Sequence, residues 1–251
     1  MKIYCRIRNQ AASKPADFEG LLSTTLNPIL VMYDFRTDLI WSQVDYLAVG
    51  ALYSLGLTSL SMILGTIIGL AVSLVRMTKN RILRFIAGSY IDVMRGIPLL
   101  ALLIWFFYGL SILIDFSFPP LFAGIACLSL KYSGYLAETF RAGIQAIEKG
   151  QSEAAFSLGF SKFQNFFRII LPQAIRIVIP PIGNSFVSML QDSSLVMLVG
   201  IWELMKRGNS VANSTLRPFE IYTAVGLLYL IMTITASRVN RYLENRFRIE
   251  H

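Results

Sequence analysis

Residues 47–75 read LAVGALYSLGLTSLSMILGTIIGLAVSLV, a stretch that contains no charged side chain. A helix needs about 20 predominantly apolar residues to cross the hydrocarbon core of a bilayer. At about 1.5 Å per residue, this stretch is longer than a perpendicular crossing requires, so we expect a tilted transmembrane helix. The stretch therefore indicates a membrane protein and directs the search for further spans along the chain.

The composition agrees with this interpretation. Of the 251 residues, 55% are hydrophobic and 15% are charged, whereas soluble domains carry about 25% charged residues. The 2 cysteines cannot build a disulfide framework, and the single histidine is the last residue, His251. Bis-histidine haem ligation and Ser-His-Asp chemistry are therefore excluded, and no cysteine–histidine cluster offers a metal site. We expect no catalytic residue, no metal and no cofactor bound by this chain.

Four further apolar stretches follow the first. One of them is interrupted by Lys131, and another carries Arg176 near its start and the pair Pro180-Pro181 inside it. The five predicted spans cover residues 47–75, 97–114, 119–137, 172–190 and 222–237. The fold class we expect is an all-α membrane protein with about five transmembrane helices.

The spans divide the chain into a transmembrane domain over residues 47–245, an N-terminal extension over 1–46 and a tail over 246–251. Residues 21–33 are apolar but too short to span comfortably. They fit an interfacial segment, a sixth weak crossing or part of an extension outside the functional unit, and the sequence leaves these alternatives open.

Lysine and arginine are distributed unevenly between the spans. They gather in the connectors 76–96 and 138–171 and in the tail after residue 237, whereas the connector 191–221 has only Lys206, Arg207 and Arg217. Connectors rich in lysine and arginine stay in the cytoplasm. We therefore expect the C-terminus to be cytoplasmic, and the net charge of +8 reflects membrane topology rather than binding to nucleic acid.

The connector between the third and fourth spans is long for a simple link. Over residues 160–171 its apolar residues fall at the spacing of an amphipathic helix. Glu153-Ala154-Ala155 precedes this helix and offers small side chains to a partner, and Gly159 suits a break between two short helices. From periodicity alone, a pair of helices packing under the bundle at the membrane surface is as good an explanation.

The order of these residues resembles the EAA loop of permease subunits in ATP-binding-cassette importers. Two further segments, Arg95-Gly96-Ile97-Pro98 and Leu190-Gln191-Asp192-Ser193-Ser194-Leu195, resemble the polar amino acid permease branch of that family. The resemblance covers roughly residues 40–245. It implies that the loop is a coupling helix that docks on an ATPase subunit. The residues assigned to this coupling are Glu153, Ala154, Ala155, Gly159 and Pro172.

The resemblance also implies partners and a location. Two permease subunits, identical or homologous, would lie side by side in the plasma (bacterial inner) membrane, above two ATP-binding subunits, and an external solute-binding protein would deliver a polar amino acid. The chain lacks the G-x-x-x-x-G-K-[ST] pattern, so ATP would be hydrolysed by the separate subunit.

Several polar residues are candidates for the translocation path. Pro180-Pro181 is expected to bend or interrupt the fourth span, and freed backbone groups are tolerated only next to protein or a cavity. A structural kink alone explains the prolines equally well. The ammonium of Lys131 would meet either the carboxylate of a solute or that of Asp192, and we favour Asp192. The candidates for the path are Lys131, Asn184, Ser188, Gln191, Asp192 and Ser193.

Two further interpretations concern packing and mechanism. Ser61, Gly65, Gly69 and Ser73 recur every fourth residue, and we expect this small-residue stripe to pack within the chain rather than form a subunit interface. The alternative function is a stand-alone, ion-coupled secondary transporter. Such proteins often contain internal repeats and carboxylates inside their spans, and neither is found in this sequence.

Overall fold

The computed structural model of the chain describes residues 34–247, and this part contains helices and connecting turns but no β-strand. The apolar stretch 21–33 and residues 248–251 lie outside the described residues. The chain divides into two compact units, Met1–Trp41 and Ser42–His251. The tertiary packing described below is that of the second unit. The expected all-α fold is confirmed.

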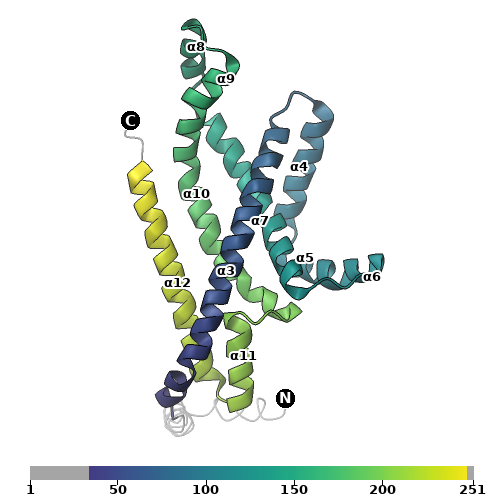
Figure 1. Cartoon of the computed structure of the whole chain (residues 1–251), viewed down its shortest axis with the longest axis vertical. Helices are drawn as coiled ribbons and strands as arrows, with labels where there is room; N and C mark the ends of the chain where they lie inside the picture. The colour runs from purple at the N-terminus through teal and green to yellow at the C-terminus, as the bar shows by residue number, and fades with distance from the viewer. Residues whose placement is uncertain (1–33, 248–251) are drawn as a thin grey trace, which may run out of the picture. The chain divides into compact units, whose positions relative to one another are not determined.

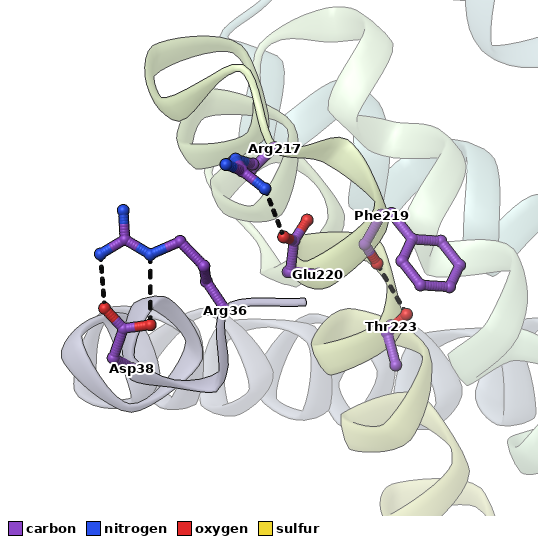
Figure 2. A network of polar contacts seen from close by, with 6 residues as sticks. All are labelled: Arg36, Asp38, Arg217, Phe219, Glu220 and Thr223. Carbon is purple, nitrogen blue, oxygen red and sulfur yellow. Dashed lines mark hydrogen bonds and ion pairs between the residues drawn. The ribbon is translucent and has the colours of Figure 1, made fainter. Parts of the chain in front are cut away.

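The first described helix, α3, runs over Thr37–Arg76 and so begins ahead of the predicted span. Its first turn contains Asp38, whose carboxylate lies 2.6 Å from the guanidinium of Arg36 (Figure 2). A carboxylate in the first turn is favoured by the partial positive charge at a helix N-terminus. The helix therefore extends into the polar sequence before residue 47, which hydropathy alone did not indicate.

The small-residue stripe of α3 packs against α7, which covers Pro120–Gln145. A Cβ atom added at Gly69 would lie 2.9 Å from the carbonyl oxygen of Ser133, so only glycine permits this approach of the two backbones. The hydroxyl of Ser129 also donates to the carbonyl of Ser61 at 3.2 Å. The prediction that the stripe packs within the chain is confirmed.

The second predicted span, residues 97–114, is not a separate straight helix. It consists of α5 (Leu99–Ile104), a π-helical segment η1 (Trp105–Leu110) and α6 (Ser111–Ile114), and it is bent by 103° from α4 (Arg81–Gly96). The residue before a proline avoids the helical conformation, and Ile97, which precedes Pro98, has ψ 128. The prediction missed this bend because hydropathy does not register backbone conformation.

The fourth predicted span is part of a longer continuous helix. The α9 turn (Lys162–Asn165), the π-helical segment η2 (Phe166–Ile170) and α10 (Leu171–Asp192) follow one another without a break. The expected interruption at Pro180-Pro181 is wrong, since both prolines lie inside α10. The side-chain amide of Asn240 in α12 (Pro218–Phe247) donates to the carbonyl of Pro180 at 3.1 Å. This contact ties α12 to the part of α10 in which the two prolines remove backbone hydrogen-bond donors.

The remaining elements connect these helices. After α10 come a 3₁₀ segment, η3 (Ser193–Val199), and α11 (Leu204–Thr215). The first turn of α12 holds Glu220, which pairs with Arg217 at 3.4 Å (Figure 2). Figure 1 shows α10 between α12 and α7, and it packs against both. The core includes Leu103, Leu128, Leu136 and Met189.

The lengths and hydropathy of the described helices indicate three or four membrane spans. Three described helices are long and apolar enough to cross a membrane, at Thr37–Arg76, Lys162–Val199 and Pro218–Arg246, and the bent pair of α4 with α5–α6 would make a fourth. The third predicted span, residues 119–137, corresponds to α7, a helix of 26 residues that extends past the predicted end. The count of five therefore stays a prediction.

Candidate functional site

The EAA-like segment forms a short helix, α8, over Lys149–Ser157. It lies with α9 at one end of the helices, called the α8 end here, and α11 lies at the other end (Figure 1). Gly159 ends α8 with φ of +81, a conformation that residues with a Cβ atom disfavour. The amides of Gly159 and Phe160 donate to the carbonyls of Phe156 and Ala155, each at 3.0 Å. These two bonds form a Schellman motif, the common glycine-terminated helix end.

Side-chain hydrogen bonds hold α8 against the helix that follows. Ser161 caps α9 in a reciprocal capping box with Gln164. The amide of Asn165 donates to the hydroxyl of Ser152 at 3.1 Å, and Gln173 donates to Gln151 at the same distance. Ala155 is 3% exposed, so the small side chain of the motif faces this contact. We call α8, α9 and η2 together the coupling hairpin.

Large apolar side chains of the coupling hairpin are exposed. Leu158 is 78% exposed and Phe163 is 70% exposed, and the rings of Phe163 and Phe167 lie 4.3 Å apart. Glu153 and Ala154 are also exposed. Exposed apolar groups that are rimmed by polar side chains mark interaction sites. The hairpin is thus ordered by its own hydrogen bonds, while its apolar side chains remain accessible.

Pro172 lies next to the π-helical segment. In η2 the amide of Leu171 donates to the carbonyl of Phe166, five residues back, and Pro172 has no amide hydrogen to continue an α-helical pattern. From its place between the amphipathic helix and the fourth span, the sequence predicts that Pro172 fixes the angle between two helices. This prediction is wrong, because the helix continues from α9 into α10. A displacement of α9 would therefore be transmitted directly along α10.

The direct hydrogen bond of Lys131 goes to a different group from the one we favoured, while Asp192 acts on it only through its charge. Its ammonium donates to the carbonyl of Ile97 at 2.7 Å, next to the bend between α4 and α5. Asp192 instead accepts a hydrogen bond from the hydroxyl of Tyr132 at 3.0 Å. Within residues 34–247 no hydrogen bond or ion pair joins Lys131 to Asp192. Lys131 thus stabilises the backbone where proline interrupts the helix.

The other path candidates do not form one cluster. Asn184 accepts a hydrogen bond from Asn240 at 3.1 Å, and Ser188 lies one turn further along α10 on its exposed side. The hydroxyl of Ser193 is buried and donates to the carbonyl of Leu190 at 2.7 Å. Gln191 alone of these candidates lines a described cavity, one of about 410 Å³. The cavity is lined by Gln191, Ser194, Met205, Tyr222, Val225, Gly226 and Tyr229.

A buried carboxylate beside this cavity was missed in the sequence. Glu203 is 0% exposed and accepts hydrogen bonds from the hydroxyls of Ser54 (3.2 Å) and Tyr229 (2.9 Å) and from the amides of Met205 (2.7 Å) and Lys206 (2.8 Å). Burial raises the pKa of Glu203, and its hydrogen bonds act in the opposite direction. Its position before the helical sequence 204–215 was the available signal, because a negative charge is favoured at a helix N-terminus.

The comparisons with known proteins agree with the resemblance. Residues 61–249 match the family described as binding-protein-dependent transport system inner membrane component. A probable glutamine ABC transporter permease protein, GlnM of Bacillus subtilis, is 41% identical over 180 residues, 72% of this chain and 83% of that protein. The histidine/lysine/arginine/ornithine transport system permease protein HisQ of Escherichia coli is 34% identical over 210 residues, 80% and 92% of the two chains.

A solved structure is similar over most of the chain. The crystal structure of an amino acid ABC transporter with histidines superimposes with a TM-score of 0.78 at 35% identity, covering 86% of this chain and 99% of that one. The family match spans well over half of the present chain and includes the coupling hairpin. The chain therefore belongs to the family of binding-protein-dependent transport system inner membrane components.

Proposed function

We propose that this chain is the permease subunit of an ATP-driven importer for a polar amino acid, and that a separate ATPase subunit docks on its coupling hairpin. The observation that carries the docking proposal is the exposure of Leu158 and Phe163 on a hairpin that is otherwise ordered by its own hydrogen bonds. The named relatives are permeases for glutamine and for basic amino acids, which supports the substrate class.

The coupling is a rigid-body movement. ATP binding closes the pair of ATPase subunits and displaces the hairpin that is docked on them. Because α9, η2 and α10 are continuous, the displacement reaches the exposed polar side of α10. This mechanism needs a firm contact and a stiff element, and no catalytic residue in the permease. The residues in contact with the ATPase would be Glu153, Ala154 and the exposed apolar side chains, with Gly159 shaping the turn.

The path for the solute runs beside the second half of α10. Gln191 and the neighbouring Ser194, Tyr222 and Tyr229 place neutral polar groups at the wall of this mainly apolar cavity, where the three hydroxyls also hydrogen-bond to Gln191, Asn209 and Glu203. Such groups suit a zwitterionic solute that must bind and then leave, because a strong charge pair would retain it. Lys131 takes a structural part in this account, since its ammonium already binds a backbone carbonyl.

The assembly includes further subunits. A second permease, the ATP-binding subunits and an external solute-binding protein complete the importer, and the C-terminus faces the cytoplasm. ATP is used by the partner subunits. The stand-alone secondary transporter is not supported, since relatives of this chain are named as permeases of ABC transporters.

Co-purification tests the docking proposal. The tagged chain is expressed with its ATPase and solubilised, and Phe163→Ser is compared with Tyr242→Ser, a matched control because Tyr242 on α12 is 69% exposed. Removing a central aromatic side chain from an interface costs about 2 kcal/mol, or about thirtyfold in affinity. We expect Phe163→Ser to lose the ATPase and Tyr242→Ser to retain it. Equal retention by both variants would contradict docking at the hairpin.

A further inference from the structure

A second cleft, of about 400 Å³, lies between the end of α3, α4 and α7. Its lining is mainly polar, and four arginines face two carboxylates, which leaves a formal charge of +2. The cleft is distinct from the cavity beside Gln191, since the two share no lining residue. The charged residues that line it are Arg76, Arg84, Asp92, Arg95, Glu138 and Arg141.

One ion pair within the cleft is satisfied internally. Arg141 donates from Nε to Glu138 at 2.9 Å and also binds Gln145, as expected for opposite charges three residues apart on one helix. The guanidinium of Arg141 holds the pKa of the Glu138 carboxyl below its usual range. Both members of the pair are therefore ionised and neutralise each other. The net positive charge of the cleft comes from the other arginines.

Those other arginines are not in ion-pair contact with a carboxylate among the described residues, although Arg76 and Arg95 also lower the pKa of Glu138 through their charge. Arg76 donates to the backbone carbonyl of Arg84 at 2.7 Å, and the guanidinium of Arg95 lies 5.4 Å from the centre of the Tyr135 ring. Within residues 34–247, Arg76, Arg84 and Arg95 form no ion pair. An anion in the cleft would thus meet guanidinium groups with donors still available.

The position of Arg76 is fixed by the backbone of α4. A Cβ atom added at the buried Gly88 would lie 2.7 Å from Cζ of Arg76, so the guanidinium packs directly over the glycine. Together with the bond to the Arg84 carbonyl, this contact holds one donor group in place before any ligand arrives. A held guanidinium loses less conformational freedom on binding an anion than a free one would.

The opposite face of α4 is apolar and exposed. Ile82, Phe85 and Ile86 project from it, while Arg84 and Arg95 line the cleft. A helix with an exposed apolar face and a basic face is typical of the membrane interface. The charge distribution of the sequence predicts the cytoplasmic side for this segment, where anionic lipids concentrate.

We propose that this cleft binds a phosphate group through Arg76, Arg84 and Arg95, and that α4 places it at the level of the headgroups of anionic phospholipids. Planar guanidinium groups bind phosphate oxygens in pairs. A soluble phosphate compound would present the same chemistry to the cleft, and the source of the phosphate is therefore part of the test. The inference does not depend on which solute the importer carries.

The test measures lipid retention by native mass spectrometry on the full chain purified with its partners. Phosphatidylglycerol is compared with phosphatidylcholine for the wild type, for R84Q/R95Q and for R238Q/R241Q, a control with the same loss of charge on exposed positions of α12. We expect R84Q/R95Q to lower the retention of phosphatidylglycerol about tenfold, because each basic residue near an anionic headgroup contributes appreciably, and the control to match the wild type. A third variant, R84K/R95K, keeps the charge and checks folding.

Two further results decide the proposal and the source of the phosphate. Saturable binding of inorganic phosphate to the lipid-depleted wild type, lost in R84Q/R95Q, would assign the cleft to a soluble phosphate. If the lipid-depleted wild type binds phosphatidylglycerol but not inorganic phosphate, the cleft would be assigned to a lipid headgroup. Unchanged lipid retention in R84Q/R95Q, or an equal loss in R238Q/R241Q, would overturn the proposal, whatever the outcome of the ATPase co-purification.

Discussion

The α8 end and the α11 end differ in what they expose and what they bury: the first exposes apolar side chains, and the second buries a carboxylate. At the α8 end, Leu158 and Phe163 are exposed on a hairpin that the other described residues, within 34–247, leave uncovered. At the α11 end, the carboxylate of Glu203 is fully buried and receives four hydrogen bonds from within the chain. We expect a partner to cover the first region, whereas the polar groups of the second are paired within residues 34–247. Substitutions at the α8 end should therefore change assembly, and those at the α11 end should change stability.

Of the substitutions proposed to test this difference between the two ends, Glu203→Ala should have the largest effect on stability. The substitution leaves two hydroxyls and two amides without their acceptor and creates a cavity, which together cost about 3 kcal/mol. The measurement is thermal unfolding of the purified chain, together with ATPase co-purification. We expect a strongly lowered Tm and normal recruitment by the folded fraction. Loss of recruitment at an unchanged Tm would show that the α11 end is not self-contained.

Lys131→Met tests the structural assignment of the lysine ammonium. The variant leaves the carbonyl of Ile97 without its donor, which costs about 1–2 kcal/mol. Unfolding temperature and the KM for uptake in reconstituted vesicles are measured side by side. We expect a lower Tm with little change in KM. A normal Tm combined with a KM raised about tenfold would instead place Lys131 in contact with the solute.

Gly159→Asp and Gly159→Asn separate charge from backbone conformation at the end of α8. Both side chains tolerate a positive φ better than other residues do, and they have nearly the same shape. Each should cost about 1 kcal/mol relative to glycine in the hairpin. Gly159→Asp should weaken ATPase recruitment several-fold more than Gly159→Asn does. Equal recruitment by the two variants would mean that Gly159 only ends the helix and is not close to the partner.

The smallest effect concerns the pH dependence of stability. Because burial raises the folded-state pKa of Glu203, the folded state holds this proton more tightly than the unfolded state does. The contribution of Glu203 to the unfolding free energy is then largest below the ordinary glutamate pKa of about 4.3 and falls as the pH rises toward the folded-state pKa. Glu203→Gln should flatten this part of the Tm profile. An unchanged profile in the variant would assign the pH dependence to other groups.

The sequence was most informative for segments whose apolar side chains stay exposed on the folded chain. The order and spacing of Glu153, Ala155 and Gly159 pointed to the segment that forms α8 and its glycine-terminated end. Charge-free stretches located the long apolar helices, because side chains that face lipid have to be apolar.

The rest could not be predicted because it depends on tertiary contacts. Pro98 and Pro180 both lack an amide hydrogen, yet the chain bends by 103° between α4 and α5 at the first and stays helical through the second. The partner of Lys131 and the burial of Glu203 depend on segments distant in the sequence. A single sequence does not reveal which of these segments meet.

Site-directed cross-linking tests the central claim most directly. Ala154 is exposed on α8 and is replaced by cysteine, and the chain in its assembled complex is treated with a short thiol-reactive cross-linker. The same substitution at the exposed Ser214 of α11 serves as the control. If the ATPase subunit docks on the hairpin, we expect an adduct between the permease and the ATPase subunit for Ala154→Cys and none for Ser214→Cys. An ATPase adduct at Ser214→Cys but not at Ala154→Cys would contradict docking at the coupling hairpin.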